Sequence, residues 1–241
     1  MAFLCTRVQS PDKDDYKKLG KVMKYLRNTR EITLTMEAGE GPKWWVDSSY
    51  AVHPNMRSHN GIFMTLGRGM AYSTSNKQKL NTKSSTEAEL VAIEDSMGQI
   101  LWTRHFLAAQ GEHVPTMTIY QDNKSTILLA ENGTSSSKRT KHLDVRYFFI
   151  TDRIAKGEVK IALCPTQQML GDFFTKPLQE TQFTQMRSKI LNLPSSSITA
   201  VHRSVLENDK NKIADAGKTR LNTRLGKENA IIGMKNKNSK S

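Results

Sequence analysis

Apolar residues recur at helical spacing in some stretches of this chain and at strand spacing in others. Near the N-terminus, turn and cap residues at Ser10, Pro11 and Asp12 precede apolar residues three and four positions apart, which predict an amphipathic helix. These apolar residues are Tyr16, Leu19, Met23 and Leu26. A second stripe predicts a long helix from about Ser85 to Gln110. Its apolar positions are Leu90, Ile93, Met97, Ile100, Leu101 and Leu107.

Short apolar runs bounded by glycine, proline and polar residues predict the strands. KWWVDSSYA follows GEGP at Gly39–Pro42, and a turn at Gly67–Gly69 separates GIFMTLG from RGMAYSTSN. MTIYQDN and EVKIALCP predict two more strands, and TQQMLGDFFTKPL a final core helix. The predicted order is three strands, helix, strand, helices, strand, helix. Such alternation implies a mixed sheet covered by helices, an α/β fold.

The periodicity weakens after Leu193. Residues 195–241 are rich in Lys, Asn and Ser, which is typical of a mostly disordered segment. Residues 201–241 hold ten Lys or Arg and four Asp or Glu, so they contribute +6 of the net charge of +13. We therefore expect three parts: an N-terminal helical segment over residues 1–40, a folded domain over 41–193 and a basic tail over 194–241.

The charge indicates a class of partner. A net charge of +13 suits a polyanion, and nucleic acid is the commonest one. Two cysteines are too few for a disulfide framework or a cysteine-rich zinc site. The sequence lacks the run of roughly 18 apolar residues that a membrane span needs. We expect an intracellular protein without a membrane partner, and the sequence does not decide between a cytoplasmic particle and the nucleus.

Acidic residues stand where two predicted strands end. In KWWVDSS and TIYQDNK an apolar strand runs directly into Asp47 and Asp122. Each aspartate alone is typical of a turn or a helix cap. Two in parallel settings, with Asp172 and a glutamate on predicted helices, favour a metal site, because gathered carboxylates repel one another unless a cation such as Mg²⁺ compensates them. Two such ions about 3.5–4 Å apart can support cleavage of a phosphodiester.

The stretch KSSTEAEL offers two glutamates for this site. Ser84 with Glu87, and Thr86 with Glu89, each fit a capping box, so either glutamate could serve only to start the helix. At about 100° per residue, Glu89 lies roughly 60° from the centre of the apolar stripe and Glu87 roughly 100°. The spacing favours Glu89 as the side chain that faces the sheet.

Five motifs then carry a resemblance to a known family. In chain order they are VDSSYA, SSTEAEL, YQDNKSTILLA, KRTKHLDVRYFFI and PTQQMLGDFFTKPL. Together they resemble the ribonuclease H domain at the C-terminal end of copia-type retrotransposon polyproteins, and NKQKLNTKSSTEAEL and TKHLDVRYFFI are highly specific to it. The resemblance covers about residues 42–193. Residues 1–40 resemble the end of the reverse transcriptase region that precedes this domain.

The resemblance implies a ribonuclease H-like fold, with a five-stranded mixed sheet flanked by helices, and cleavage of RNA in RNA–DNA hybrids. It implies two Mg²⁺ ions, with Mn²⁺ as a substitute, and the reverse transcriptase portion of the same element as a partner. The ligand tetrad that it implies is Asp47, Glu89, Asp122 and Asp172.

Three departures from related proteins are visible in the sequence. Ser49 stands where family members often carry a second acid in D-A-D-W-A, which singles out Asp47. LCPTQQMLGD lacks the histidine that cellular ribonucleases H carry before the last helix, and slower turnover is therefore expected. No Tyr-x-Asp-Asp motif is present, so we expect no polymerase activity in this chain.

A basic cluster in KRTKHLDV is the candidate contact to the hybrid backbone. It consists of Lys138, Arg139, Lys141 and His142. Such a cluster can bind phosphates without reading sequence, and a solvated run of charges fits the same residues. Two other functions remain open. An integrase or transposase shares the fold but uses three carboxylates and a zinc-binding segment. A truncated fragment of an element would bind nucleic acid without cutting it.

Overall fold

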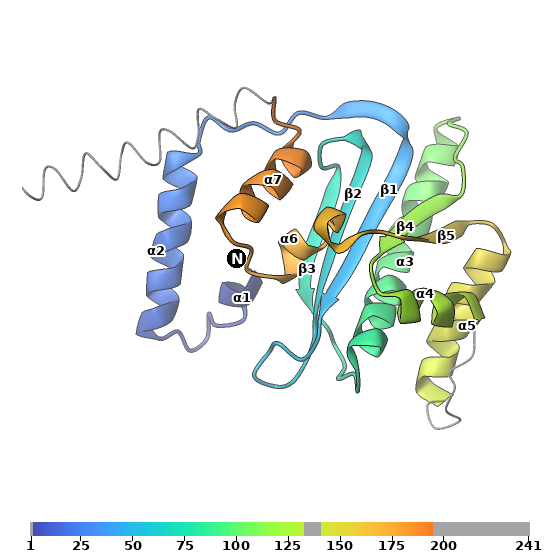
Figure 1. The fold of residues 1–241 in the computed structure, drawn as a ribbon, viewed down its shortest axis with the longest axis horizontal. Helices are drawn as coiled ribbons and strands as arrows, with labels where there is room; N and C mark the ends of the chain where they lie inside the picture. The colour runs from blue at the N-terminus through green and yellow to red at the C-terminus, as the bar shows by residue number, and fades with distance from the viewer. Residues whose placement is uncertain (1, 133–140, 195–241) are drawn as a thin grey trace, which may run out of the picture. The chain divides into compact units, whose positions relative to one another are not determined.

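The computed structural model describes residues 2–132 and 141–194. One compact unit spans Met1–Leu193, and the finer boundary near residue 40 stays a prediction. The tail predicted from residue 194 lies, apart from Pro194 itself, outside the described residues. The elements are α1 Ala2–Cys5, α2 Lys13–Asn28, β1 Glu37–Ser49, β2 His59–Arg68, β3 Tyr72–Lys77, α3 Ser85–Ala109, β4 Met117–Gln121, α4 Lys124–Asn132, α5 Lys141–Ala155, β5 Val159–Leu163, the 3₁₀ turn η1 Thr166–Gln168, α6 Asp172–Thr175 and α7 Glu180–Leu191 (Figure 1).

A five-stranded mixed sheet forms the centre of this unit, in the order β3-β2-β1-β4-β5. β1, β2 and β3 pair antiparallel, while β4 runs parallel to β1 and β5 runs parallel to β4. Figure 1 shows α3, α4 and α5 on one side of the sheet and α6 and α7 on the other. This arrangement confirms the predicted α/β fold class, a five-stranded mixed sheet flanked by helices.

The two faces of the sheet carry separate cores, because successive side chains of a strand point to opposite faces. Trp44 lies in the larger core, and Trp45 packs against the smaller one. The larger core also holds the predicted stripe of α3, with Leu90, Ile93, Met97 and Ile100 fully buried. The smaller core lies under α6 and α7 and contains Phe63, Leu170, Met186 and Ile190.

The stretch after β5 departs from the single core helix that the sequence predicts. It forms η1, then the four-residue helix α6, and the chain continues into α7. Pro177 explains the break, since a proline disfavours helical backbone at the residue before it. Lys176 accordingly caps α6 in an extended conformation, with φ −120° and ψ 144°. Asp172 therefore stands at the start of a single helical turn.

Two glycines allow α6 to lie directly on the sheet. A Cβ at Gly61 on β2 would lie 2.6 Å from the Thr175 side chain and 2.7 Å from the Gly171 carbonyl oxygen. A Cβ at Gly171 would lie 2.8 Å from the Cβ of Asp47. Real side chains do not approach so closely, so glycine at both positions is what brings Asp172 next to Asp47.

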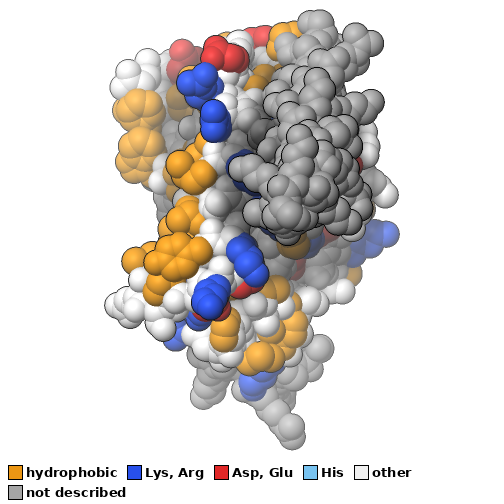
Figure 2. Space-filling view, turned by 90° about the vertical axis from the view of Figure 1, so that its left-hand side faces the viewer, with side chains coloured by type: hydrophobic (Ala, Val, Ile, Leu, Met, Phe, Trp, Pro, Cys, Tyr) orange, Lys and Arg blue, Asp and Glu red, His pale blue; other side chains and the backbone are white. Residues whose placement is uncertain are grey.

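The N-terminal helix forms as predicted, but the apolar side chains of its face are largely exposed. α2 begins at Asp12, whose side chain accepts from the Asp15 backbone N–H while the Asp15 side chain accepts from that of Asp12. The four apolar side chains are between 39% and 65% exposed; they are Tyr16, Leu19, Met23 and Leu26. Figure 2, which views the α2 side of the molecule, shows hydrophobic side chains interspersed with Lys and Arg. Tyr25 packs edge-on against Phe183 of α7, with ring centroids 5.8 Å apart.

None of the helices in the described part of the chain is long and apolar enough to cross a bilayer.

Candidate active site

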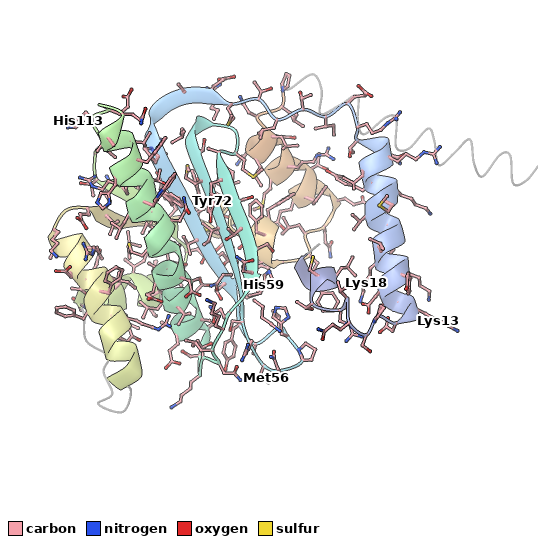
Figure 3. The ribbon with its side chains drawn as sticks, turned by 180° about the vertical axis from the view of Figure 1, so that it is seen from behind. Lys13, Lys18, Met56, His59, Tyr72 and His113 are labelled. Atoms are coloured by element: carbon pink, nitrogen blue, oxygen red, sulfur yellow. The ribbon has the colours of Figure 1, made fainter. Side chains whose placement is uncertain are left out.

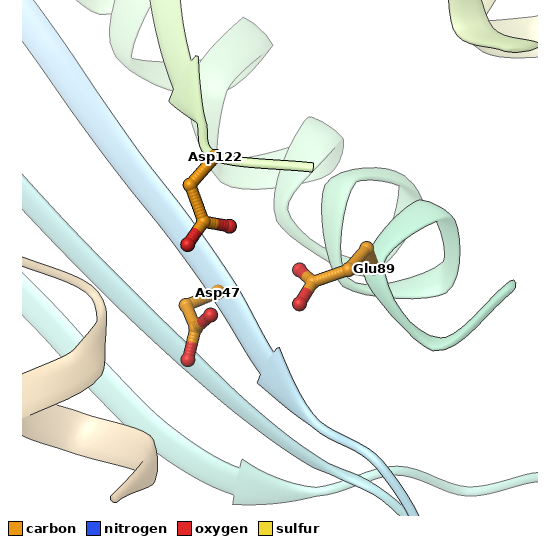
Figure 4. A group of neighbouring side chains, drawn as sticks. All are labelled: Asp47, Glu89 and Asp122. Atoms are coloured by element: carbon orange, nitrogen blue, oxygen red, sulfur yellow. The ribbon is translucent and has the colours of Figure 1, made fainter. Parts of the chain in front are cut away.

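Three carboxylates converge at one end of the sheet. Asp47 lies near the end of β1, Asp122 directly follows β4, and Glu89 lies in the second turn of α3. One oxygen from each lies within 4.8 Å of the others, and Figure 4 shows the side chains pointing toward one another. Asp47 and Glu89 are buried, whereas Asp122 is half-buried. The two aspartates meet because β1 and β4 are neighbouring parallel strands, whose carboxyl ends open at the same edge.

The two glutamates of KSSTEAEL have different surroundings. The Ser84 hydroxyl caps α3 by accepting from the Glu87 backbone N–H, and the Glu87 carboxylate accepts from the backbone N–H of Lys83 at 2.7 Å. Glu87 is thus occupied at the helix start. Glu89 is the glutamate that lies beside the two aspartates.

Asp172 lies next to this group but outside it. The group whose oxygens lie within 4.8 Å of one another consists of Asp47, Glu89 and Asp122. The Asp172 carboxylate instead accepts from the Lys176 ammonium at 2.7 Å, and the same ammonium lies 3.4 Å from the Asp47 carboxylate. The Thr175 hydroxyl also donates to Asp47. The structure therefore brings three of the four expected ligands together and links the fourth to them through Lys176.

The electrostatics of the site reflect this crowding. Burial, and then the negative charge of Asp47, raises the pKa of the Glu89 carboxyl well above its ordinary value. The same two causes raise the pKa of Asp172 to about 6. Burial works to lower the pKa of the Lys176 ammonium, but Asp47 and Asp172 outweigh it and raise that pKa. The buried position of the site thus disfavours the charged forms of Glu89 and Asp172.

Gln121 holds two of the carboxylates in place, and the sequence-based reasoning did not identify it. Its side-chain amide donates to the Glu89 carboxylate at 3.1 Å and to the Val46 carbonyl at 3.2 Å. Its side-chain oxygen accepts from the backbone N–H groups of Asp122 and Asn123. A signal was present: Met117 and Ile119 are buried at alternate positions of β4, and Gln121 continues that series as a polar residue.

Three other side chains that touch the carboxylates were also not identified. The Thr166 hydroxyl donates to Asp122 at 3.1 Å, and Asp47 is contacted by Thr175 at the end of α6 and by Lys176, which caps that helix. Lys176 follows Asp172 by four residues, a spacing at which opposite charges meet on a helix. This spacing is the signal that could have revealed the pair.

The predicted basic cluster lies at the edge of the described residues. Lys138 and Arg139 lie outside the described residues. Lys141 and His142 belong to the first turn of α5, and only their backbone is described. Their contact with nucleic acid stays a prediction.

The donor set fits a hard divalent cation. Carboxylate oxygens are the ligands that Mg²⁺ prefers, whereas structural zinc sites use cysteine and histidine. Three carboxylates whose oxygens lie within 4.8 Å can share such a cation.

Comparison with known proteins identifies relatives in transposons. The chain is 29% identical over 179 residues to the retrovirus-related Pol polyprotein from transposon TNT 1-94 of Nicotiana tabacum, and the match covers 73% of this chain and 13% of the relative. It is 30% identical over 191 residues to the Pol polyprotein from transposon RE2 of Arabidopsis thaliana, covering 75% and 13%. The chain thus spans about an eighth of the length of these relatives. No family model matches it.

Two solved structures illustrate the partial overlap of this chain with known backbones. LC11-RNase H1 isolated from compost overlaps with a TM-score of 0.41 at 10% identity, over 54% of this chain and 87% of that one. The protease–reverse transcriptase of prototype foamy virus overlaps with a TM-score of 0.38 at 13% identity, over 66% and 21%.

Proposed function

We propose that this chain, a homologue of the retrovirus-related Pol polyproteins of copia-type plant transposons, is a ribonuclease H-type nuclease that cuts the RNA strand of RNA–DNA hybrids. The observation that carries the proposal is the convergence of Asp47, Glu89 and Asp122 from β1, α3 and the end of β4. These residues are 42 and 33 positions apart in the sequence. Each stands in one of the motifs that resemble the ribonuclease H domain of such polyproteins.

The proposed ligands are Asp47, Glu89, Asp122 and Asp172, and the proposed cofactor is a pair of Mg²⁺ ions, with Mn²⁺ as a substitute. When bound, such ions activate a water molecule and stabilise the departing 3′ oxygen. Hard divalent ions suit this set because all four side chains offer oxygen donors. Burial, and then the charge of Asp47, raises the pKa of Glu89, and a bound cation would offset both effects.

Other residues of this chain would hold the carboxylates in position. Gln121 fixes Glu89 by donating to it, and orients the chain at Asp122 by accepting from two backbone N–H groups. Thr175 fixes Asp47 in the same way. Asp122 is half-buried, while Asp47 and Glu89 are buried. Asp122 is therefore the carboxylate of this group most open to a phosphate that approaches from solvent.

Recognition of the hybrid would rest on its backbone and shape. Contacts to phosphates position a duplex without reading sequence, and 2′-hydroxyls with near-A-form geometry distinguish RNA–DNA hybrids from DNA. Lys138, Arg139, Lys141 and His142 are the proposed phosphate contacts, and the reverse transcriptase portion of the same element is the proposed protein partner.

The decisive experiment compares Asp122→Asn with Asp14→Asn. Asp14 lies on α2, exposed and paired with Lys18, so the control removes the same charge away from the site. With Mg²⁺ and a labelled RNA–DNA hybrid, we expect the wild-type chain and Asp14→Asn to cut the RNA strand. Asp122→Asn should lose cleavage by at least about a hundredfold while binding the hybrid nearly as tightly. Full cleavage by Asp122→Asn would refute the assignment of the site.

The same assay separates the rival functions. Cleavage or joining of double-stranded DNA in preference to the hybrid would indicate an integrase or transposase. Binding of the hybrid without cleavage in either Mg²⁺ or Mn²⁺ would indicate a non-catalytic fragment of an element.

The missing histidine in LCPTQQMLGD predicts slow product release. The single-turnover rate of cleavage should therefore exceed the steady-state rate, and equal rates would contradict this.

A further inference from the structure

We propose that Lys176 is an internal cation that weakens the hold of the site on a divalent ion by keeping Asp172 and Asp47 paired with its ammonium group. The inference deepens the proposed function and rests on it in one respect: the carboxylates are taken as the ligands of that ion. Lys176 would thereby set the divalent-ion concentration at which all four carboxylates bind together.

The first support is the position of the ammonium between two buried acids. Its nitrogen lies 2.7 Å from one oxygen of Asp172 and 3.4 Å from one oxygen of Asp47. The side chains of Asp47 and Asp172 are 1% and 4% exposed, whereas that of Lys176 is 40% exposed. The ammonium can therefore withdraw into water by rotating its own side chain, while the acids cannot leave.

The second support is that the backbone around the pair is held firmly. The Ser75 hydroxyl donates to the Phe174 carbonyl at 2.7 Å, and His59, at the start of β2 (Figure 3), lies 2.8 Å from that hydroxyl. The Ser49 hydroxyl donates to the Thr175 carbonyl at 3.3 Å. With α6 anchored to β1 and β3 in this way, side-chain rotation is the motion that remains for Asp172 to exchange Lys176 for a shared cation.

The third support is that the Lys176 ammonium and a divalent ion compete for the same two carboxylates, Asp47 and Asp172. An ammonium so close to two carboxylates neutralises part of the charge that a divalent ion would bind, and it repels that ion. Removing the ammonium should have two effects of opposite sign. The buried acids lose their partner, which lowers the stability of the protein without a divalent ion. The divalent ion gains a more negative site and an unengaged Asp172, which raises its affinity. A purely structural salt bridge predicts the first effect alone.

The test measures Ca²⁺ binding by calorimetry and thermal unfolding in EDTA, neither of which depends on catalysis. The variant is Lys176→Met, with Lys176→Arg as the conservative change. Lys160→Met is the matched control, because Lys160 is exposed on β5 and pairs in register with Thr118, at the end of the sheet away from Asp122. We expect Lys176→Met to unfold at a lower temperature in EDTA and to bind Ca²⁺ about tenfold more tightly. Lys176→Arg and Lys160→Met should bind it like the wild-type chain.

A second variant and a double variant separate the charge of Lys176 from its hydrogen bond. Lys176→Gln keeps an N–H donor without the charge, so it should retain more stability while still binding Ca²⁺ more tightly than the wild type. Adding Asp172→Asn to Lys176→Met should abolish the gain in affinity. Unchanged Ca²⁺ affinity in both Lys176→Met and Lys176→Gln would overturn the inference and leave the proposed function standing. Absence of Ca²⁺ binding by the wild type and every variant would overturn both.

Discussion

Glu89 and Asp172 are carboxylic acids placed where their charged forms are poorly solvated. Burial and the charge of Asp47 raise the pKa of both groups. Gln121 donates to Glu89 and Lys176 donates to Asp172, yet neither contact offsets the burial. Keeping these acids ionised at neutral pH therefore costs stability. This cost fits the proposed role of both residues as ligands of a cation, rather than a role in the fold.

Replacing Glu89 with glutamine should stabilise the protein while destroying its function. The amide removes the buried charge next to Asp47, and its oxygen can still accept from Gln121. In EDTA at about pH 7 we expect a higher free energy of unfolding than that of the wild type, measured by urea denaturation, together with loss of hybrid cleavage. Glu87→Gln is the matched control: it should leave cleavage intact and lower stability slightly, since Glu87 serves the start of α3. A less stable Glu89→Gln would contradict the assignment of a strained charge.

The raised pKa of Asp172 makes the stability of the folded protein depend on pH. Its pKa is about 6 in the folded protein, against an ordinary 3.8. Below the ordinary value both states hold the proton, and above 6 the folded protein bears the full cost of the buried charge. This group therefore makes stability fall as the pH rises from about 4 to about 6. In EDTA, the stability of Asp172→Asn relative to the wild type should rise over that range.

The control for this measurement is Asp14→Asn, for which the sign is reversed. The hydrogen bond from Lys18 lowers the pKa of Asp14. Its charge stabilises the folded state above the ordinary pKa, so the stability of Asp14→Asn relative to the wild type should not rise as the pH rises. A difference between Asp172→Asn and wild type that does not vary with pH would show that Asp172 carries no raised pKa.

At this scale the sequence predicts the acids but not their neighbours. Asp47, Glu89 and Asp122 could be identified because each stands at a strand end or on the core-facing side of a helix. Gln121, Thr175 and Lys176 act through hydrogen bonds across elements, and those contacts depend on register and on the short turn of α6. Neither feature follows from local periodicity.

The position of Asp172, the fourth proposed ligand, is determined by α6. Its single turn lies on β1 and β2 because Gly61 and Gly171 leave room for it. The sequence predicts one longer helix here, since it places apolar residues at helical spacing. Instead, Pro177 ends α6 after one turn, and Gly171 packs closely against Asp47 just before that turn begins. Asp172 and Lys176 therefore lie at opposite ends of a single helical turn.

Gly171→Ala tests this packing. The new Cβ would meet the backbone nitrogen of Asp47 at 3.0 Å and its Cβ at 2.8 Å, so β1 or α6 must shift. We expect a loss of about 1–3 kcal/mol in the free energy of unfolding, and weaker divalent-ion binding because Asp172 moves with α6. Gly98→Ala is the control: Gly98 lies inside α3 with no atom within 4 Å of the new Cβ. That change should stabilise the protein by about 0.5–1 kcal/mol. Equal effects of the two substitutions would contradict the close packing.

α2 shows what a periodic pattern leaves undetermined. Tyr16, Leu19, Met23 and Leu26 predict the helix and its apolar face correctly, yet all four are exposed. Periodicity identifies which face of a helix is apolar, and it does not say whether another element covers that face. Most of the apolar stripe of α3 is buried and that of α2 is exposed, although both helices show the same spacing of apolar residues.

Across the whole molecule, the site depends on topology more than on any motif. The acids come from β1, α3, the end of β4 and α6, and the last two are 50 residues apart in the sequence. The order of strands and helices predicts a mixed sheet, and β4 parallel to β1 then places the carboxyl ends of two strands side by side. The strand order β3-β2-β1-β4-β5 is not evident from residue patterns, because several pairings suit the same strands.

The basic charge of the protein predicts that its binding to the hybrid depends strongly on salt. Residues 1–200 hold 26 basic and 19 acidic residues, a net charge of +7 within the total of +13. The acidic site is thus a local exception on a basic protein, as expected if phosphates must be attracted to it.

Counterions leave the nucleic acid when its phosphates are neutralised. The logarithm of the affinity for the hybrid should therefore fall linearly with the logarithm of the salt concentration. With Asp122→Asn and Mg²⁺, we expect fluorescence anisotropy to show at least about a tenfold loss of affinity between about 50 and 200 mM salt. A hybrid with methylphosphonates in its DNA strand, which removes half of the backbone charge, should bind more weakly and show a shallower slope. Equal slopes for the two hybrids would mean that the DNA backbone is not what the basic protein binds.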